Sequence, residues 1–538
     1  MSHQDSNSTH SPAEKEPVPS RADEVSNLLN AVQDLLIPFI RSADEDASTK
    51  KTGHGLSVQG GGPRTALVEH HKPHKLSQLM DLNLPRTGLA QAGFLEQVEQ
   101  ILQYSVNTWD RGFMSKLYAS TDAPGLAAEL ILATLNTNVH TYEVSPALTM
   151  IEKHTTRALA RLFGLTGPHA GGVSVQGGSM SNATSIVIAR NTLHPATKTH
   201  GNTANDLKLV LFTSAHGHYS VEKAAQMLGL GASAVRAVPV DPHTGRMDPA
   251  ALSALVAAAK AQGQTPFYLN ATAGTTVLGS YDPIGPLAAV CREHGLWLHV
   301  DASWGGPAAL SPAHAPKLAG SHLADSIAVN PHKMMGVPLT CSFLLGADLR
   351  RFHASNTLPA SYLFHHDDDD HDHASEPSTS SSSSDLHYYD LADLTLQCGR
   401  RGDSLKLYLS WIYHGSDGYA GQIDAAFATA AHLARLVASH PDLVSVGENP
   451  PPCCQVCFYY AGGGTLHDEA GDNGRVTKEV VRGLVPRGFM IDYAGGDERG
   501  AFMRAVVSRG TGRGTVEGLV EAVVELGRKA WGRGGMNE

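Results

Sequence analysis

A lysine follows a short apolar run and a tight turn in the segment SIAVNPHKMMGVP. Residues 326–329 have the character of a buried strand, and an Asn-Pro-His turn separates them from Lys333. Apolar residues flank this lysine, and burial lowers the pKa of an ammonium group because the charged form loses its hydration. A lysine of that kind can form a Schiff base with a carbonyl carbon. Lys333 is therefore the first candidate for covalent chemistry.

Asp301 ends another apolar run, in LWLHVDASWGG. An unpaired carboxylate at the end of a buried strand is unfavourable, so Asp301 requires a partner that is charged or donates hydrogen bonds. The ring nitrogen of a heteroaromatic cofactor is one such partner, and the carboxylate would keep that nitrogen protonated. Capping of a following helix is the alternative role for this residue.

The segment GGVSVQGGSMSNA combines an apolar run, a glycine turn and a helix that we expect to begin near Ser181. Backbone N–H groups at the start of a helix attract phosphate, and the hydroxyls of Ser179 and Ser181 would add donors. Two further polar residues follow apolar runs, namely His218, whose imidazole could stack on a flat ring, and Thr272. A reactive lysine, a ring-nitrogen carboxylate, a phosphate-binding turn and a stacking histidine together indicate a site for pyridoxal phosphate (PLP).

The elements that position these residues are apolar runs that alternate with helical stretches between about residues 120 and 345. The runs are LKLVLFTS, AVRAVPV, PFYLNAT, LWLHVDA, SIAVN and CSFLLG. Strands alternating with helices predict an α/β fold with a largely parallel sheet that is covered on both faces. Ligands of such sheets bind at the carboxyl ends of the strands, where these polar residues are expected.

The composition of the 538 residues fits a globular enzyme, because 42% are hydrophobic and 17% are charged. The formal net charge of −11 predicts no basic face for nucleic acid or for an anionic membrane. The polar start MSHQDSNSTHSPAEKEPVPS does not resemble a signal peptide, and no apolar run is long enough to span a membrane. Six cysteines in so long a chain do not form a disulfide framework, so we expect a cytoplasmic protein.

Three segments stand apart from the strand–helix pattern. Residues 25–41 place apolar side chains at helical spacing and predict an amphipathic helix. Residues 364–385 are rich in Asp and Ser, which predicts a solvated insertion without the scaffold that a metal site needs. We interpret Cys453, Cys454 and Cys457 as thiols of a buried strand, because a zinc site requires a fourth ligand.

We divide the chain into three parts. Residues 1–85 form an N-terminal segment, partly disordered, that contains the amphipathic helix. Residues 86–404 form the large PLP-binding domain, with the low-complexity insertion at 365–385. Residues 405–538 begin with an apolar helix and an Ala-rich helix and form a smaller α/β C-terminal domain.

The motifs, in this order, closely resemble those of the group II PLP-dependent decarboxylases, and most of all the acidic branch that acts on glutamate, aspartate or cysteine sulfinate. The resemblance runs from about residue 70 to 530 and is carried by TNVHTYEVSP, GGSMSNA, SAHGHYS, ATAGTTVLGSYDP, HVDASWGG, NPHKMMGVPLTCS, ASYLF and LQCGRRGDSLKL. It implies the aspartate-aminotransferase fold (PLP-dependent transferase fold type I) and a homodimer with each site at the subunit interface. It implies pyridoxal 5'-phosphate as the cofactor and no metal.

The resemblance also assigns roles to single residues. Lys333 would carry the cofactor, Asp301 would pair with its ring nitrogen, and His218 would stack on the ring and take part in catalysis. The remaining cofactor contacts fall on Ser179, Met180, Ser181, Thr272, Ser303, Asn330 and His332. Gln78 and Arg504 match residues that bind the substrate, and the guanidinium of Arg504 suits the α-carboxylate. A carboxylate held perpendicular to the ring is the group that leaves, so this contact would select loss of CO2.

In the family, a mobile loop carries a tyrosine that protonates the substrate carbon, and the Asp/Ser-rich insertion falls in that loop. Tyr388 and Tyr389 lie close by in LHYYDLADL. Because Tyr389 matches a tyrosine further downstream, Tyr388 is the candidate for the acid.

Three departures from the family surround the expected substrate. Ser303 replaces alanine, His140 replaces an aromatic residue, and the Phe-Phe-Asn that precedes the substrate glutamine is Lys-Leu-Ser before Gln78. They favour a shorter acid, L-aspartate, which would give β-alanine and CO2. Glutamate, giving 4-aminobutyrate, and cysteine sulfinate, giving hypotaurine, are the alternatives. Other classes are an aromatic decarboxylase, an aldehyde synthase, an aminotransferase or a non-catalytic relative, although Arg504 and Gln78 argue against bulky apolar substrates.

Overall fold

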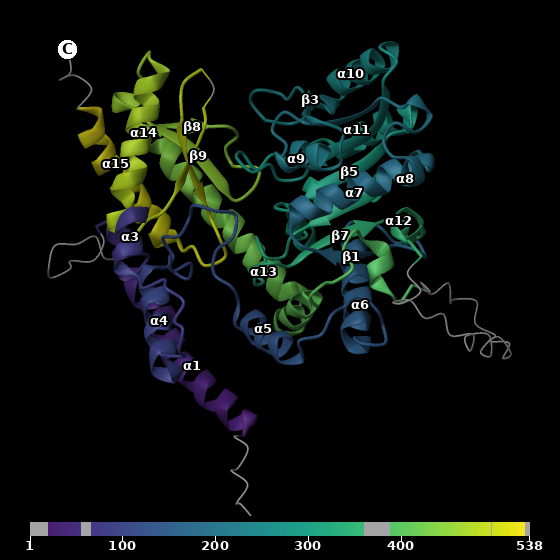
Figure 1. Ribbon diagram of the computed structural model, residues 1–538. Helices are drawn as coiled ribbons and strands as arrows, with labels where there is room; N and C mark the ends of the chain where they lie inside the picture. Colours follow the sequence, from purple (N-terminus) through teal and green to yellow (C-terminus); the bar gives the residue numbers. More distant parts are fainter. Residues whose placement is uncertain (1–19, 55–65, 360–387, 497, 533–538) are drawn as a thin grey trace, which may run out of the picture.

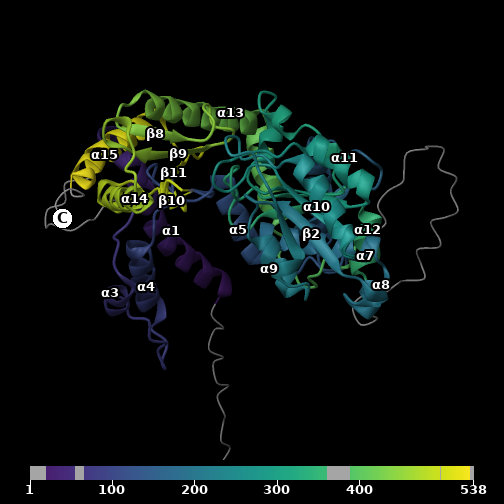
Figure 2. The same ribbon diagram turned by 90° about the horizontal axis from the view of Figure 1, so that it is seen from above.

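The computed structural model describes residues 20–54, 66–359, 388–496 and 498–532. These residues form two β-sheets joined by one long helix, and helices from the N-terminal part stand beside the smaller sheet (Figures 1 and 2). The Asp/Ser-rich segment 364–385 lies outside the described residues, so its predicted character stays a prediction.

The larger sheet has seven strands in the order β1-β7-β6-β5-β4-β2-β3. They are β1 (Gly171–Val175), β2 (Leu209–Ser214), β3 (Val235–Val238), β4 (Thr265–Thr272), β5 (Trp297–Ala302), β6 (Ser326–Val329) and β7 (Ser342–Gly346). Neighbours from β3 to β6 run parallel, and β7 is antiparallel to both β6 and β1. The predicted α/β fold with a largely parallel sheet is confirmed, and every apolar run named above contains a strand.

Both faces of this sheet are buried, because alternate residues of its strands enter different hydrophobic clusters. On β7, Phe343 and Leu345 belong to one cluster, whereas Leu344 belongs to the other. The helices of this part are α5 (Ala123–Leu135), α6 (Pro146–Leu162), α7 (Gly178–Leu193), α8 (Ala196–His200), α9 (Ser220–Met227), α10 (Pro249–Ala261), α11 (Ile284–His294) and α12 (Leu349–Asn356). Burial on two faces fixes the register of the strands and therefore the positions of their carboxyl ends.

The smaller sheet is antiparallel, with the order β10-β11-β9-β8. Its strands are β8 (Leu443–Val446), β9 (Gln455–Tyr460), β10 (Asp492–Ala494) and β11 (Phe502–Val506), and its helices are α14 (Ala470–Leu484) and α15 (Arg513–Trp531). Helix α13 (Ser404–Ser439) extends from this sheet to the larger one (Figure 2). Gly415, with φ 67°, interrupts α13 between the two helices expected from the sequence. All three clustered cysteines are buried, Cys457 within β9 and the other two just before it.

The N-terminal part contains α1 (Arg21–Glu45), α2 (Thr49–Thr52), α3 (Pro73–Leu79) and α4 (Ala90–Tyr104). The predicted amphipathic helix is thus confirmed within α1. Buried Lys50 pairs with Asp46 at 2.7 Å and with Asp110 at 3.2 Å, which fixes the end of this segment to the chain that enters the smaller sheet. The domain limits drawn from the sequence stay a proposal, because α13 belongs to both sheets.

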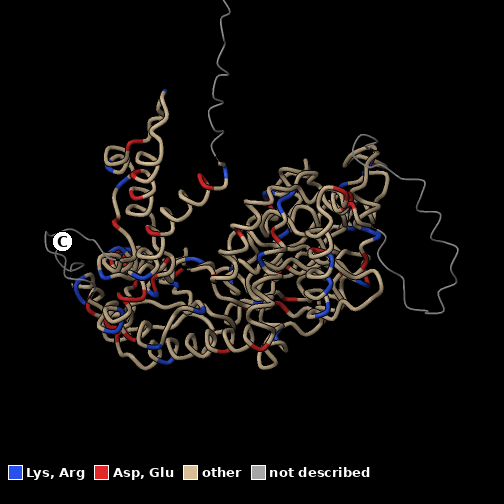
Figure 3. The backbone as a smooth tube through the Cα atoms, turned by 90° about the horizontal axis from the view of Figure 1, so that it is seen from below, with Lys and Arg blue, Asp and Glu red and all other residues tan. Residues whose placement is uncertain are grey.

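Charged residues of both signs are interspersed over the two sheets and their helices (Figure 3). Within the described residues, no helix is both long and apolar enough to cross a membrane.

Candidate active site

The polar residues predicted from the sequence gather at the carboxyl ends of β4, β5 and β6. Thr272 lies opposite Asp301 in the register of β4 with β5, and β6 continues the row. A hollow of about 590 Å³, open to solvent, lies at these ends. Its lining includes the predicted residues Ser179, His218, Thr272, Asp301, Ser303, Asn330, His332 and Lys333. Gly178, Gly274, Thr276 and Trp304 complete the lining and were not identified from the sequence.

Asp301 is a buried carboxylate with two hydrogen bonds. Its Oδ2 accepts from Nδ2 of Asn182 at 2.9 Å, and its Oδ1 accepts from the backbone N–H of Ser303 at 3.1 Å. Burial by itself would raise the pKa of Asp301, but the hydrogen bond from Asn182, the positive charge of Lys333 and the bond from Ser303 outweigh burial and lower it. Asp301 is therefore ionised and can stabilise a cationic ring nitrogen.

A chain of buried side chains orients Asn182 toward Asp301. His299 Nε2 lies 3.0 Å from Oδ1 of Asn182, and its Nδ1 lies 2.9 Å from Oγ of Ser326. Burial lowers the pKa of His299 to about 4, so its imidazole is neutral at pH 7. A neutral imidazole that donates from Nε2 leaves Oδ1 of Asn182 as the acceptor and its amide N–H for Asp301. The sequence offered one signal for Asn182, a polar side chain in the buried first turns of a helix.

Lys333 lies four residues beyond the end of β6, in a turn closed by two backbone hydrogen bonds. Its N–H donates to the carbonyl of Asn330 at 3.0 Å, and the N–H of Gly336 donates to the carbonyl of Lys333 at 3.2 Å. Burial lowers the pKa of Lys333, and the charge of Asp301 opposes this only in part. The larger fraction of neutral amine is what a nucleophilic lysine requires.

Helix α7 begins at Gly178, three residues earlier than the sequence suggested, because Gly177 takes the left-handed φ of 86° that ends the turn. Ser179 therefore lies in the first turn and lines the hollow, whereas Met180 and Ser181 do not line it. A Cβ atom on Gly178 would lie 2.6 Å from Oγ of Ser303, so a larger residue here would displace that side chain. The first N–H groups of a helix lack acceptors within it, which makes this end suitable for a phosphate.

Three hydroxyls near the hollow have no hydrogen-bond partner among the described residues. They are Oγ of Ser181, Oγ1 of Thr272 and Oγ of Ser303, and all three are buried. Buried polar atoms are nearly always paired, so these hydroxyls are available to a bound group. Nearby, the N–H of Ser220 donates to Nδ1 of His218 at 3.2 Å, and burial lowers the pKa of His218. His218 therefore presents a neutral flat ring to the hollow.

Asn330 and His332 line the hollow, but their polar atoms serve the protein itself. Nδ1 of His332 lies 3.1 Å from the backbone N–H of Cys341, and burial lowers the pKa of His332 to about 4. The side-chain amide of Asn330 bonds to the carbonyl of Val329 and to Oγ of Ser342, both at 3.1 Å. These contacts fix the turn that carries Lys333 against β7.

One wall of the hollow is attached to the smaller sheet. Gln455, at the start of β9, accepts from Nε1 of Trp304 at 2.9 Å and donates to the carbonyl of Thr275 at 2.9 Å. Arg504, on β11, donates from Nη1 to the carbonyl of Thr276 at 3.0 Å. Since Thr276 lines the hollow, the predicted substrate arginine borders it, whereas nothing in the sequence pointed to Gln455.

Two predicted residues lie away from the hollow of their own chain. Gln78 is exposed on α3, among the helices beside the smaller sheet. Because it was predicted to bind the substrate in a site at the subunit interface, this role stays a prediction. Tyr388 stacks on His353 with ring centroids 4.2 Å apart, and its carbonyl accepts from Nζ of Lys153 at 3.1 Å. Its proposed role as an acid therefore stays a prediction.

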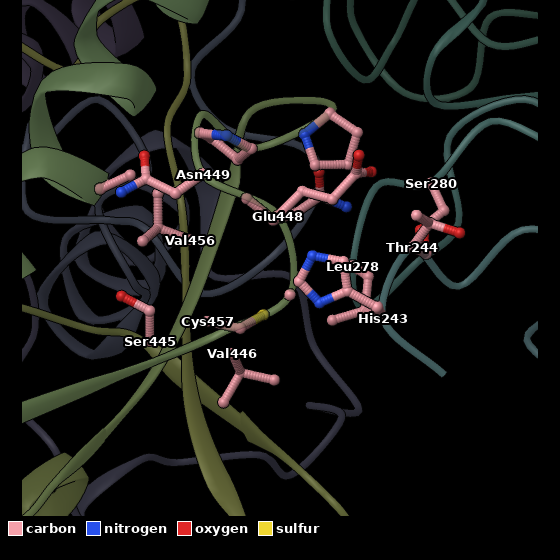
Figure 4. A pocket seen from close by; sticks show the side chains of 15 residues that line it. His243, Thr244, Leu278, Ser280, Ser445, Val446, Glu448, Asn449, Val456 and Cys457 are labelled. Atoms are coloured by element: carbon pink, nitrogen blue, oxygen red, sulfur yellow. The ribbon is translucent and has the colours of Figure 1, made fainter. Parts of the chain in front are cut away.

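A second hollow lies between the two sheets (Figure 4). His243 and Leu278 stand on one side, and Val446 and Cys457 belong to strands on the other. The thiol of Cys457 donates to the carbonyl of Val277 at 3.4 Å, and burial raises the pKa of this thiol to about 12. A protonated, hydrogen-bonded thiol is not reactive, so this hollow does not compete with the first as a catalytic site.

Comparisons with known proteins agree with this geometry. The family model described as the pyridoxal-dependent decarboxylase conserved domain matches residues 73–461. The L-aspartate decarboxylase dtxS4 of Metarhizium robertsii is 47% identical over 490 residues, which cover 91% of this chain and 94% of that protein. The cysteine sulfinic acid decarboxylase of Homo sapiens is 37% identical over 456 residues, covering 82% and 87%. The crystal structure of mouse CSAD, 32% identical, covers 94% of this chain and 99% of its own, with a TM-score of 0.81.

Proposed function

The chain belongs to the pyridoxal-dependent decarboxylase family, and we propose that it removes the α-carboxylate of a short acidic L-amino acid. L-aspartate is the preferred substrate, with β-alanine and CO2 as the products. Glutamate and cysteine sulfinate remain the alternatives. The observation that carries this proposal is the guanidinium of Arg504, which borders the hollow at Thr276.

Pyridoxal phosphate is the cofactor, and the chemistry of the hollow fits it. The start of α7, where Ser179 lines the hollow, suits a phosphate, and the buried hydroxyl of Thr272 has no partner among the described residues. Asp301 suits a ring nitrogen, His218 offers a flat ring, and Lys333 offers an amine of lowered pKa. When bound, the cofactor withdraws electrons from the α-carbon of the amino acid attached to it.

Three residues of the chain have separate roles in the proposed reaction. Asp301 keeps a negative charge in a buried place, which maintains the positive charge on the ring that faces it. Arg504 would bind a carboxylate of the substrate through its guanidinium and so hold the substrate in one orientation relative to the cofactor. Tyr388 remains our candidate for the residue that delivers a proton to that carbon.

Aspartate is preferred for two reasons. The relative from Metarhizium robertsii, at 47% identity, is an L-aspartate decarboxylase. In addition, Ser303 lies beside Gly178 in the lining of the hollow, and its hydroxyl has no partner in the protein. A polar group there suits a small hydrophilic substrate better than a bulky aromatic one.

We propose that the enzyme is a cytoplasmic homodimer. Its six cysteines are free thiols, which is typical of a reducing compartment. Large apolar side chains on α1, α4 and α5 are exposed in the single chain, and a second copy of the chain would cover them. They are Val25, Leu29, Ile37, Phe94, Ile101, Leu126, Leu130, Ile131 and Leu135. Sedimentation equilibrium of the holoenzyme tests this, and a monomer at micromolar concentration would contradict it.

Substrate profiling tests the reaction itself. The holoenzyme is offered aspartate, glutamate and cysteine sulfinate, with tyrosine and tryptophan as aromatic controls, and both CO2 and the amine are measured. We expect the highest kcat/KM for aspartate. Release of CO2 from none of the three acids, or faster turnover of an aromatic amino acid, would refute the proposal.

A further inference from the structure

Arg504 is held in a cluster that includes two further charged residues. Its Nη2 donates to the backbone carbonyl of Ser115 at 2.9 Å and to Oδ2 of Asp492 at 3.2 Å. The same Oδ2 accepts from Nζ of Lys116 at 2.7 Å. The carboxylate of Asp492 therefore lies between two cations, one from β11 and one from a segment almost 400 residues earlier in the sequence.

The backbone positions in this cluster are fixed by strand pairing. Asp492 lies directly opposite Arg504 in the register of β10 with β11. Met114, two residues before Lys116, donates to the carbonyl of Met490 at 2.8 Å and accepts from the N–H of Val506 at 2.9 Å. The main chain two residues before Lys116 is thus tied to β11 and to the residue near the start of β10, whereas the side chain of Lys116 is 51% exposed and can move.

Arg504 keeps one nitrogen, namely Nε, whose N–H makes no hydrogen bond to the part of the protein that the structure describes. Its Nε is buried and has no partner among the described residues, although both Nη atoms are paired. Its side chain is 9% exposed, so this atom is a nearly buried donor beside the residue that lines the hollow. A buried guanidinium N–H without a partner indicates a place for an acceptor.

The charges of the cluster show what kind of acceptor fits. Arg504 and Lys116 each carry one positive charge and Asp492 one negative charge, so the cluster has one net positive charge. Without Lys116, Asp492 would neutralise Arg504 and would compete with an anionic substrate for it. Lys116 thus restores the charge that attracts an anion.

From these contacts we propose that Lys116 is a specificity-determining residue that supplies the second positive charge for an acidic substrate, while Asp492 is a positioning residue for both cations. This inference rests on the proposed function and names its substrate side. One carboxylate of a dicarboxylic amino acid would bind Arg504, and the other would attract the mobile ammonium of Lys116. An amino acid without a side-chain carboxylate would gain nothing from Lys116.

The test uses four holoenzyme variants beside the wild type: Lys116→Met, Asp492→Asn, the two combined, and Lys529→Met as the control. Lys529 also pairs with a carboxylate at 2.7 Å and is 63% exposed, but it lies on α15. We measure kcat and KM for aspartate, and the inhibition constants of succinate and propionate. We expect Lys116→Met to raise KM for aspartate and Ki for succinate about tenfold, with kcat and Ki for propionate within about twofold.

The variant that combines Lys116→Met with Asp492→Asn separates the effect of the net charge from the effect of the Lys116 side chain itself. It restores one net positive charge at Arg504 but still lacks the ammonium for the second carboxylate, so we expect its KM to recover only in part. Full recovery of KM would overturn direct contact of Lys116 with the substrate. Unchanged KM and Ki in Lys116→Met would overturn the inference. An equal rise in Ki for succinate and for propionate would overturn it too, because it would show that Lys116 has only a structural role.

Failure of the proposed function gives a different pattern. If no acid is decarboxylated, that proposal fails. Succinate and propionate binding, followed through the visible absorbance of the bound cofactor, still measures the effect of Lys116. A wild-type preference for succinate that disappears in Lys116→Met would support the inference even then, and the absence of any such preference would refute it.

Discussion

The active-site region contains two aspartates that each face a lysine, and their surroundings are opposite. Asp301 is buried, receives hydrogen bonds from Asn182 and Ser303, and lies within the electrostatic reach of Lys333. Asp492, whose side chain is 28% exposed, contacts Lys116 and Arg504 at the edge of the smaller sheet. We call these the deep pair and the shallow pair.

The difference lies in what surrounds the charges. In the deep pair, fixed hydrogen bonds keep Asp301 ionised although it is buried, and burial favours the neutral amine of Lys333. In the shallow pair, water screens the charges, so each contact is weak and the group it binds can be exchanged. We therefore propose that catalytic chemistry belongs to the deep pair and substrate selection to the shallow pair.

Removing Lys333, the cation of the deep pair, should reduce turnover more than any other change. In Lys333→Ala the amine that attaches the cofactor is lost, so we expect turnover to fall by about a thousandfold or more. The visible absorbance of the cofactor–lysine linkage should disappear as well. Lys260→Ala, which changes an exposed lysine of α10, serves as the control. Retained absorbance in the Lys333 variant would contradict the assignment.

Removing the charge of Asp301, the anion of the deep pair, should cause the next largest loss of turnover. Asp301→Asn keeps the shape of the side chain but not its charge, so we expect kcat to fall by about a hundredfold or more while the cofactor stays bound. Single-turnover rates and cofactor absorbance of the purified variant measure the two quantities separately. A kcat within threefold of the wild type would show that this charge is not needed.

The free energy of unfolding should depend on pH through the buried carboxylate of Asp282, which lies behind the end of β4. Its carboxylate accepts from the backbone N–H groups of Thr272 and Met247, both at 2.7 Å. Burial raises its pKa from 3.8 to about 6, and these two bonds oppose the rise in part. Between these values the folded state binds more protons than the unfolded state, so the contribution to stability is present at low pH and is lost as pH rises.

The Asp282→Asn variant isolates this term, because asparagine does not titrate. The difference in free energy of unfolding, wild type minus variant, should decrease by about 2 to 3 kcal/mol between about pH 4 and about pH 7. Denaturant unfolding at several pH values measures it. Titration of His299 and His332 is common to both proteins and cancels, and a difference that stays constant with pH would disprove the effect.

A conservative change of Arg504, in the shallow pair, should reduce activity less than either change in the deep pair. Arg504→Lys keeps the charge but loses the planar fork, so we expect KM for the acidic substrate to rise about tenfold with a smaller change in kcat. Steady-state kinetics on the holoenzyme separate the two constants. A larger loss in kcat than in KM would move Arg504 from substrate binding into the chemical step.

The same contrast explains how much could be predicted from the sequence. The deep residues follow buried strands, and both the apolar runs and the polar residues after them are visible in the sequence. Lys333, Asp301 and Thr272 therefore lie where the strand pattern placed them. Asn182 was missed because a polar residue in a helix gives no sign of which way it faces.

The shallow residues come together only through long-range pairing. Lys116 and Asp492 are far apart in the sequence, and neither follows a buried strand of the larger sheet. The register of the smaller sheet brings Asp492 opposite Arg504, and Lys116 reaches the same carboxylate from a distant segment. Where contacts depend on the docking of two domains, local sequence patterns carry little information about them.

Gln455 connects the larger sheet with the smaller sheet through the hydrogen bonds of its side chain and of its strand. Its single amide bonds to Trp304 and Thr275 of the larger domain, while its strand pairs with the strand that carries Arg504. Arg504 lies two positions along the neighbouring strand from the residue paired with Gln455, and it donates to Thr276, the residue that follows Thr275. The two side chains thus join one loop of the hollow to adjacent strands of the smaller sheet. Loss of the Gln455 amide would therefore alter the place of the Arg504 guanidinium relative to the hollow.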